Sequence, residues 1–259
     1  MNFIYSNFDK KIIIMKNLTL IFTILSINLS ISQNSNTNNN YTASNIINEY
    51  FTSIGGLKKI NKIKTLHKKF SSEIVDAANI NMSGELIFKI PDMYCSNLKI
   101  DQIGDIECVK YDGENCILTR NHNNKKIENQ IEGEILNKKK IDFYPFPILQ
   151  LIKENTLFKL LYSNHDLDTS YYKIQIQNHD IDTTFLFFDK NNNYLVKKDV
   201  IDGKTKNTTE YKNFKTINGI VFPFLEISTI EIDTTIVQTN IKRYTEITIN
   251  KKFTKKHFQ

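Results

Sequence analysis

The stretch 183–232, TTFLFFDKNNNYLVKKDVIDGKTKNTTEYKNFKTINGIVFPFLEISTIEI, decides the fold. It contains four segments rich in aromatic and β-branched residues, which favour β-strands. Three short polar turns separate these segments, at 191–193, at Asp202-Gly203 and at Asn218-Gly219. Asp-Gly and Asn-Gly pairs favour tight hairpins, so we expect consecutive strands to run antiparallel as a meander. Because no helical segment alternates with these strands, a parallel nucleotide-binding sheet is not expected.

A two-residue periodicity also marks the chain before this stretch. Between residues 65 and 100, three segments each alternate apolar and polar residues. Alternation of this kind is typical of half-buried strands, with one face toward a core and one toward water. Further strands are expected at 106–111, 114–119, 157–162, 171–176 and 235–250.

Helices are expected at two places, near the start of the domain and in the middle of the chain. In the first, four apolar residues recur at i, i+3, i+4 and i+7, which indicates one buried helix face. They are Ile47, Tyr50, Phe51 and Ile54. Gly55 and Gly56 end this helix, and a second short helix follows over 57–63. Pro147 fits the first turn of the mid-chain helix, whereas the polar residues 120–140 predict a loop.

The N-terminal segment has the layout of an export signal. Residues 1–32 combine a basic start, a short apolar stretch and small residues that end at Ser32, near which we expect cleavage. The sequence therefore predicts a periplasmic or secreted protein, with a polar linker at 33–43 and a single domain at 44–259. No cysteine follows the apolar stretch before Cys95, so a lipid anchor is not expected. An uncleaved N-terminal anchor is the alternative.

Composition limits the classes of partner. The chain has 259 residues, 40% of them hydrophobic, which is enough for a sizeable core. Its net charge of +6 is spread along the chain, and Arg120 and Arg243 are the only arginines. Nucleic-acid-binding proteins concentrate their basic residues on one face or helix, so we expect no nucleic-acid partner.

Three cysteines, Cys95, Cys108 and Cys116, fall in neighbouring predicted strands. In an oxidising compartment one disulfide could join two of them and leave one thiol over. Their spacing does not identify the pair, and it matches no CxxC motif. The alternative is that all three are buried as small apolar residues.

The sequence carries none of the common catalytic motifs. It lacks HExxH, HxxEH, GxSxG, the P-loop and a GxGxxG turn after a strand, so we expect neither an enzyme nor a cofactor. Two Asn-His-Asp segments, at 164–169 and 178–183, contain residues that can bind a divalent metal. They flank one predicted strand at its opposite ends, further apart than one coordination shell, so no metal site is expected.

Several turn and strand-end motifs, taken in order, carry a resemblance to a known family. They are IGGLKKI at 54–60, YDGE at 111–114, FFD at 187–189, YLVKK at 194–198, YKNF at 211–214, INGIVFP at 217–223 and EITIN at 246–250. The set resembles the outer-membrane lipoprotein carrier (LolA/LolB-like) superfamily, in a secreted Bacteroidetes branch. Over about residues 44–258, this resemblance implies an α+β fold. The fold would be a strongly curved antiparallel sheet, an incomplete β-barrel, covered by N-terminal and mid-chain helices.

The resemblance also implies an apolar cavity that shelters acyl chains, and a buried arginine that ties a lid to the sheet. Neither Arg120 nor Arg243 lies in a motif that matches this arginine. An acyl chain needs an apolar lining. The candidate lipid-binding residues are Phe70, Met82, Leu86, Phe88, Tyr94, Leu98, Tyr172 and Ile174. The alternative for each of them is that it fills a closed core.

Two functions follow from this sequence. The first is a monomeric, exported binding protein that holds a lipid or lipoprotein acyl chain in a half-barrel, as in outer-membrane lipoprotein sorting. The second is a non-enzymatic accessory module that docks on an envelope complex or a peptidase without a lipid ligand. In both cases the partners expected are lipids or envelope proteins.

Overall fold

The computed structural model describes most of the chain that follows the predicted linker. The described residues are 42–75, 80–122, 125–161, 170–177 and 183–259. All of them belong to one compact unit, Tyr41–Gln259. The predicted signal peptide lies outside them, as does the predicted linker up to residue 41. Within the described part of the chain, no helix has both the length and the apolar character needed to cross a membrane.

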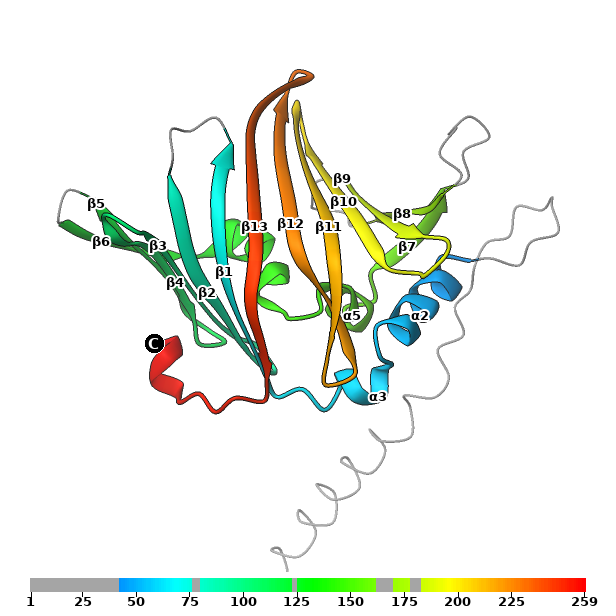
Figure 1. Ribbon diagram of the computed structural model, residues 1–259, viewed down its shortest axis with the longest axis horizontal. Coiled ribbons are helices and arrows are strands. Elements are labelled where there is room, and N and C mark those ends of the chain that lie inside the picture. Colours follow the sequence, from blue (N-terminus) through cyan, green and yellow to red (C-terminus); the bar gives the residue numbers. More distant parts are fainter. Residues whose placement is uncertain (1–41, 76–79, 123–124, 162–169, 178–182) are drawn as a thin grey trace, which may run out of the picture. The chain divides into compact units, whose positions relative to one another are not determined.

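Within these residues, thirteen strands form one antiparallel sheet that curves strongly and does not close (Figure 1). Their order is β6-β5-β4-β3-β2-β1-β13-β12-β11-β10-β9-β8-β7, so two meanders meet where β1 pairs with β13. This confirms the predicted fold class. The first meander comprises β1 (Thr65–Val75), β2 (Asn81–Lys89), β3 (Met93–Ile100), β4 (Gly104–Tyr111), β5 (Cys116–His122) and β6 (Lys125–Ile131). The second comprises β7 (Leu157–Leu161), β8 (Tyr171–Gln177), β9 (Thr183–Asp189), β10 (Leu195–Asp202), β11 (Thr205–Ile217), β12 (Ile220–Ile232) and β13 (Thr235–Ile249).

The predicted loop at 120–140 was wrong. This segment contains the end of β5, the edge strand β6 and helix α4 (Gly133–Lys140). In β6 only Ile131 is buried, and α4 buries no residue, so neither element has the apolar face that periodicity detects. Main-chain pairing with β5 holds β6 in the sheet instead.

The predicted helices are present, and they lie on the inner side of the curved sheet (Figure 1). Helix α2 (Ala43–Ser53) begins at Thr42, whose hydroxyl accepts a hydrogen bond from the Asn45 backbone N–H at 3.2 Å. The other elements are α3 (Leu57–Ile60), the 3-10 turn η2 (Ile141–Phe143), α5 (Pro147–Lys153) and the C-terminal 3-10 turn η3 (Lys255–Phe258). Unlike the others, η3 packs on the outer face, where Phe258 joins Ile87 and Cys95.

The end of α2 is fixed directly to the β11–β12 turn. The Val221 backbone N–H donates a hydrogen bond to the Ile54 carbonyl at 2.9 Å. Gly55 has a φ of +123°, and a Cβ atom there would lie 2.3 Å from the Gly219 carbonyl oxygen. Gly55 therefore allows both the turn after the helix and the close approach of two backbones. Two of the sequence motifs, 54–60 and 217–223, meet at this contact.

The three cysteines lie in three neighbouring strands, as predicted, and all are free. In the β3–β4 register Cys95 pairs with Lys110 and Cys108 with Asn97, so both thiols lie on the outer face. Cys116 is buried on the inner face, in a cluster with Tyr111. Among the described residues, the two outer thiols are therefore the pair that shares a face.

Replacement of Gly55 by alanine should destabilise the fold more than the same change at Gly56. Both residues have a positive φ, but nothing lies within 4 Å of a Cβ placed at Gly56. The Gly55 variant adds a backbone clash to the conformational cost, so we expect its free energy of unfolding to fall by at least about 1 kcal/mol more. Urea unfolding of both variants measures this difference. Equal losses would show that the approach to Gly219 does not constrain the helix.

Alkylation should distinguish the three thiols. A hydrogen bond with the Cys95 thiol lowers the pKa of Cys108, whereas burial raises the pKa of Cys116. Because the thiolate is the reactive form, Cys108 should react with iodoacetamide faster than Cys116 at pH 7.5. Peptide mass spectrometry over time measures both rates, with urea-unfolded protein as the control in which they should converge. Faster modification of Cys116 in the folded protein would contradict this arrangement.

Candidate functional site

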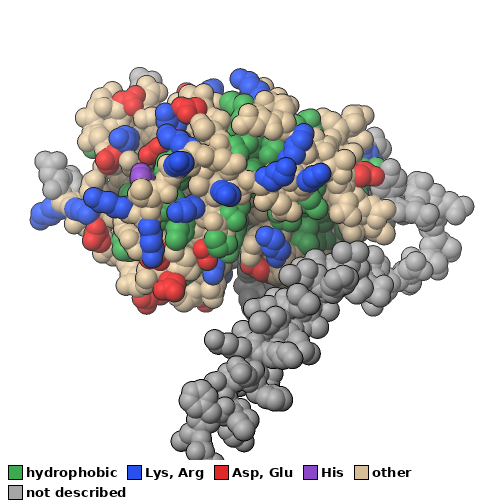
Figure 2. Space-filling model, turned by 90° about the horizontal axis from the view of Figure 1, so that it is seen from below, with side chains coloured by type: hydrophobic (Ala, Val, Ile, Leu, Met, Phe, Trp, Pro, Cys, Tyr) green, Lys and Arg blue, Asp and Glu red, His purple; other side chains and the backbone are tan. Residues whose placement is uncertain are grey.

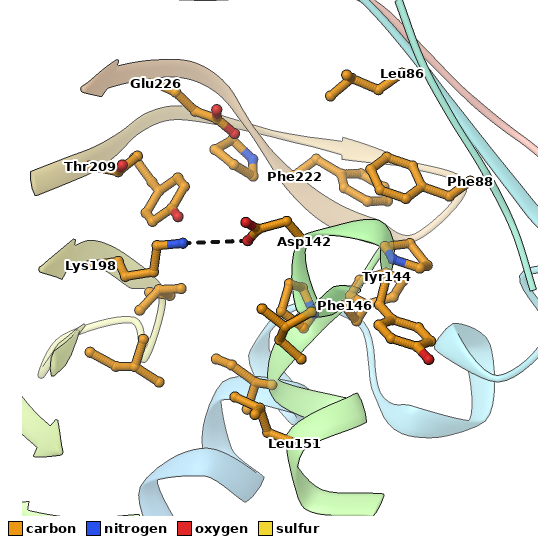
Figure 3. Close-up of a pocket in the computed structure, with 18 of the residues that line it drawn as sticks. Leu86, Phe88, Asp142, Tyr144, Phe146, Leu151, Lys198, Thr209, Phe222 and Glu226 are labelled. Carbon is orange, nitrogen blue, oxygen red and sulfur yellow. Dashed lines mark ion pairs between the residues drawn. The ribbon is translucent and has the colours of Figure 1, made fainter. Parts of the chain in front are cut away.

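A cavity of about 830 Å³ lies between the inner face of the sheet and the segment α4–η2–α5, called here the lid segment (133–153). Figure 3 shows Asp142, Tyr144 and Phe146 of the lid segment among strands that carry Phe222 and Glu226. The volume is in the range of small-molecule sites, about 300–1,000 Å³. The space is therefore large enough for a ligand.

Aromatic contacts pack the helices against the inner face at both ends of the sheet. Near β8 and β9, helix α2 packs against the sheet, and the rings of Tyr50 and Phe188 lie 5.4 Å apart. Near β3 and β4, Phe143 of the lid segment stacks on Tyr94 at 4.7 Å. Between these two contacts lie β1, β13 and β12, whose inner side chains line the cavity.

Strand register places all eight predicted lipid-binding residues on the inner face. Six alternate along β1, β2 and β3, and two lie on β8. Leu86, Phe88 and Tyr94 line the cavity. The other five lie on the same face outside the cavity lining, namely Phe70, Met82, Leu98, Tyr172 and Ile174.

Core packing accounts for the positions of two of the residues outside the lining, Phe70 and Ile174. The Phe70 ring covers Gly84, where a Cβ atom would lie 2.6 Å from it, and meets Tyr244 edge-on at 6.3 Å. Ile174 is completely buried in the cluster that contains helix α2. These two residues therefore lie in a closed core, which was the alternative to lipid binding.

Much of the lining was not predicted. It comes from β9–β13 and from the lid segment, and includes Leu186, Leu195, Tyr211, Phe222 and Tyr244. The strand residues among these could have been found by the alternation that identified β1–β3. The lid segment gives no such signal, because its contacts depend on where the chain places it over the sheet.

Five tyrosines add hydroxyl groups to the lining without adding charge. They are Tyr50, Tyr94, Tyr144, Tyr211 and Tyr244. Burial raises the pKa of each, to about 12 for Tyr94, so all remain protonated at neutral pH. The Tyr244 hydroxyl donates a hydrogen bond to Glu226 Oε1 at 2.9 Å. The cavity thus contains hydrogen-bonding groups beside its apolar surface.

An ion pair joins the lid segment to the sheet across the cavity. Lys198 Nζ of β10 lies 3.9 Å from Asp142 Oδ1 of η2 (Figure 3). The Asp142 side chain is 65% exposed, so the pair contributes at most about 1 kcal/mol to stability. Arg120 and Arg243 pair instead with Glu107 at 3.0 Å and Glu73 at 2.8 Å, and neither arginine lines this cavity.

No metal-binding group of three His, Cys, Asp or Glu side chains occurs among the described residues. The two Asn-His-Asp segments lie outside those residues, apart from Thr183. His67 is buried on the outer face, and its Nε2 lies 2.7 Å from Glu85 Oε2. Phe253 of the C-terminal segment packs edge-on against the His67 ring at 5.4 Å, so this pair is part of the packing there.

Comparison with solved structures identifies the fold. No family model matches the sequence, and no curated protein matches it. A LolA superfamily protein from Nitrosomonas europaea superposes with a TM-score of 0.56 at 13% identity, over 85% of this chain and 98% of that one. A domain named for outer membrane lipoprotein sorting, from Vibrio parahaemolyticus, gives 0.55 at 12% identity, over 83% and 94%. The protein therefore has the LolA-like fold that its motifs implied.

Proposed function

We propose that this protein is a non-enzymatic binding protein that shelters a hydrocarbon chain of a lipid or lipoprotein in the cavity. The observation that carries the proposal is the space of about 830 Å³ beside the apolar inner face. Each methylene group moved from water into such a space contributes about 0.8 kcal/mol. Ten methylene groups would therefore contribute about 8 kcal/mol, an upper bound that corresponds to micromolar affinity.

The solved structures with this fold support a role in the cell envelope. One of them is named for outer membrane lipoprotein sorting, and both cover most of their own length in the comparison. Together with the predicted signal peptide, this favours a carrier that works in the periplasm or outside the cell. The Bacteroidetes branch of the family remains a prediction from the motifs.

One feature favours the second candidate, an accessory module that docks on an envelope protein. The β12–β13 hairpin extends beyond the neighbouring strands in Figure 1, and its end exposes Ile232, Ile236 and Val237. Apolar side chains grouped at a surface mark sites of contact with other molecules. The two candidates differ in one property, because only the carrier needs a ligand inside the sheet.

Fatty acids should bind the purified full-length protein with an affinity that depends on chain length. We expect the dissociation constant to fall about tenfold for each two methylene groups added from C10 to C14, because the added surface leaves water. Displacement of a fluorescent fatty acid gives the constants, and native mass spectrometry shows whether lipid copurifies. Absence of copurified lipid and of any acyl binding would exclude the carrier and favour the docking module.

A pair of variants locates the site. Leu86 lines the cavity, whereas Leu157 is 59% exposed on β7 and does not line it. Leu86→Gln should weaken binding of C14 fatty acid about tenfold, and Leu157→Gln should leave it unchanged. Thermal unfolding of both variants checks that they fold. Equal effects of the two variants would place the acyl chain elsewhere.

A further inference from the structure

The cavity lining has an excess of positive charge. Five lysines line it, against the three carboxylates of Asp142, Glu154 and Glu226. Basic side chains are also prominent on the outside of the protein, where they are dispersed over the face shown in Figure 2 with hydrophobic side chains between them. A charge inside the cavity interacts more strongly with a ligand than these surface charges do, because water screens it less.

Among these five lysines, Lys68 is the one that lies near three aromatic rings. It lies on β1, in the middle of the sheet, and interrupts the apolar inner face between Leu66 and Phe70. Its ammonium group lies 4.9 Å from the centre of the Tyr244 ring, 5.9 Å from that of Phe222 and 6.0 Å from that of Phe88. Rings of this kind attract a cation without neutralising its charge.

Lys68 forms no ion pair with any of the described residues. Asp142 pairs with Lys198, and Glu226 accepts the hydrogen bond from Tyr244. Burial is the main reason why the pKa of Lys68 is lowered. The negative charge of Glu226 raises this pKa, and the positive charge of Lys242 lowers it. Lys68 and Lys242 both face the one carboxylate of Glu226, which leaves one positive charge unbalanced. A partly buried cation is costly unless negative charge balances it, and an anionic ligand would supply that charge.

We propose that the ligand of this cavity is an anionic amphiphile whose carboxylate or phosphate group binds the Lys68 ammonium group. This inference rests on the proposed function and specifies the headgroup of its ligand. The hydrocarbon chain would then start beside the rings of Phe88 and Phe222, which flank Lys68. The neutral tyrosine hydroxyls of the same lining can donate hydrogen bonds to the anion.

The test compares ligands that share a chain and differ in headgroup charge. Hexadecanoic acid should bind the full-length protein at least about tenfold more tightly than methyl hexadecanoate at pH 8. Hexadecyl phosphate distinguishes the two anions. If the natural ligand carries a phosphate group, hexadecyl phosphate should bind more tightly than hexadecanoic acid. If the natural ligand is a fatty acid, hexadecyl phosphate should bind no more tightly than hexadecanoic acid. Equal binding of the acid and the ester would overturn this inference alone. Failure of every ligand, the neutral ester included, would overturn the proposed function together with it.

The variant Lys68→Met tests the residue itself. It keeps an unbranched chain over the rings and removes the charge, so the preference for the acid should disappear while binding of the ester persists. Lys197→Met is the matched control, because Lys197 also lies over a ring, 3.8 Å from the centre of Phe187, but does not line the cavity. An acid preference retained in Lys68→Met, or lost in Lys197→Met, would contradict the assignment. The comparison of acid with ester in the unaltered protein decides the question even if the variant does not fold.

Discussion

A sheet with one apolar face must keep that face from water, and the rest of this structure depends on how the helices cover it. The sheet has thirteen strands, whereas the helices on its inner side are short. Curvature brings the two ends of the inner face toward the few helices available (Figure 1). Helix α2 packs at one end, Phe143 packs at the other, and the strands between them line a cavity. The cavity therefore forms because the inner face of the sheet is larger than the area that the short helices can cover.

Two contacts hold this arrangement in place. Pairing of β1 with β13 joins the meanders into one sheet. The hydrogen bond from Val221 to the Ile54 carbonyl, and the approach of Gly55 to Gly219, fix the end of α2 to the β11–β12 turn. These contacts are made by backbone atoms, so, apart from the glycine required at position 55, they tolerate extensive change in the side chains. This is consistent with a LolA-like fold at only 13% identity to a solved structure.

The sequence allowed the sheet to be predicted better than the site. Alternation identified the inner face of β1–β3, which carries six of the eight candidate residues, and Asp-Gly or Asn-Gly turns identified the hairpins, because both signals are local. The strand β6 and helix α4 were missed, since they bury almost nothing. Which inner residues line the cavity could not be predicted, because that depends on the position of the lid segment. The surroundings of Lys68 could not be predicted either, because the three rings near it come from β2, β12 and β13.

The central claim is that a hydrocarbon chain occupies the space beneath the lid segment. A crystal structure of the protein with 16-bromohexadecanoic acid tests this most directly, because the anomalous signal of bromine locates the end of the chain. We expect the carboxylate close to Lys68, and bromine inside the same cavity but away from the Phe88 and Phe222 rings that flank Lys68. A cavity closed by its own side chains, with bromine only on the outer surface or absent, would contradict the account.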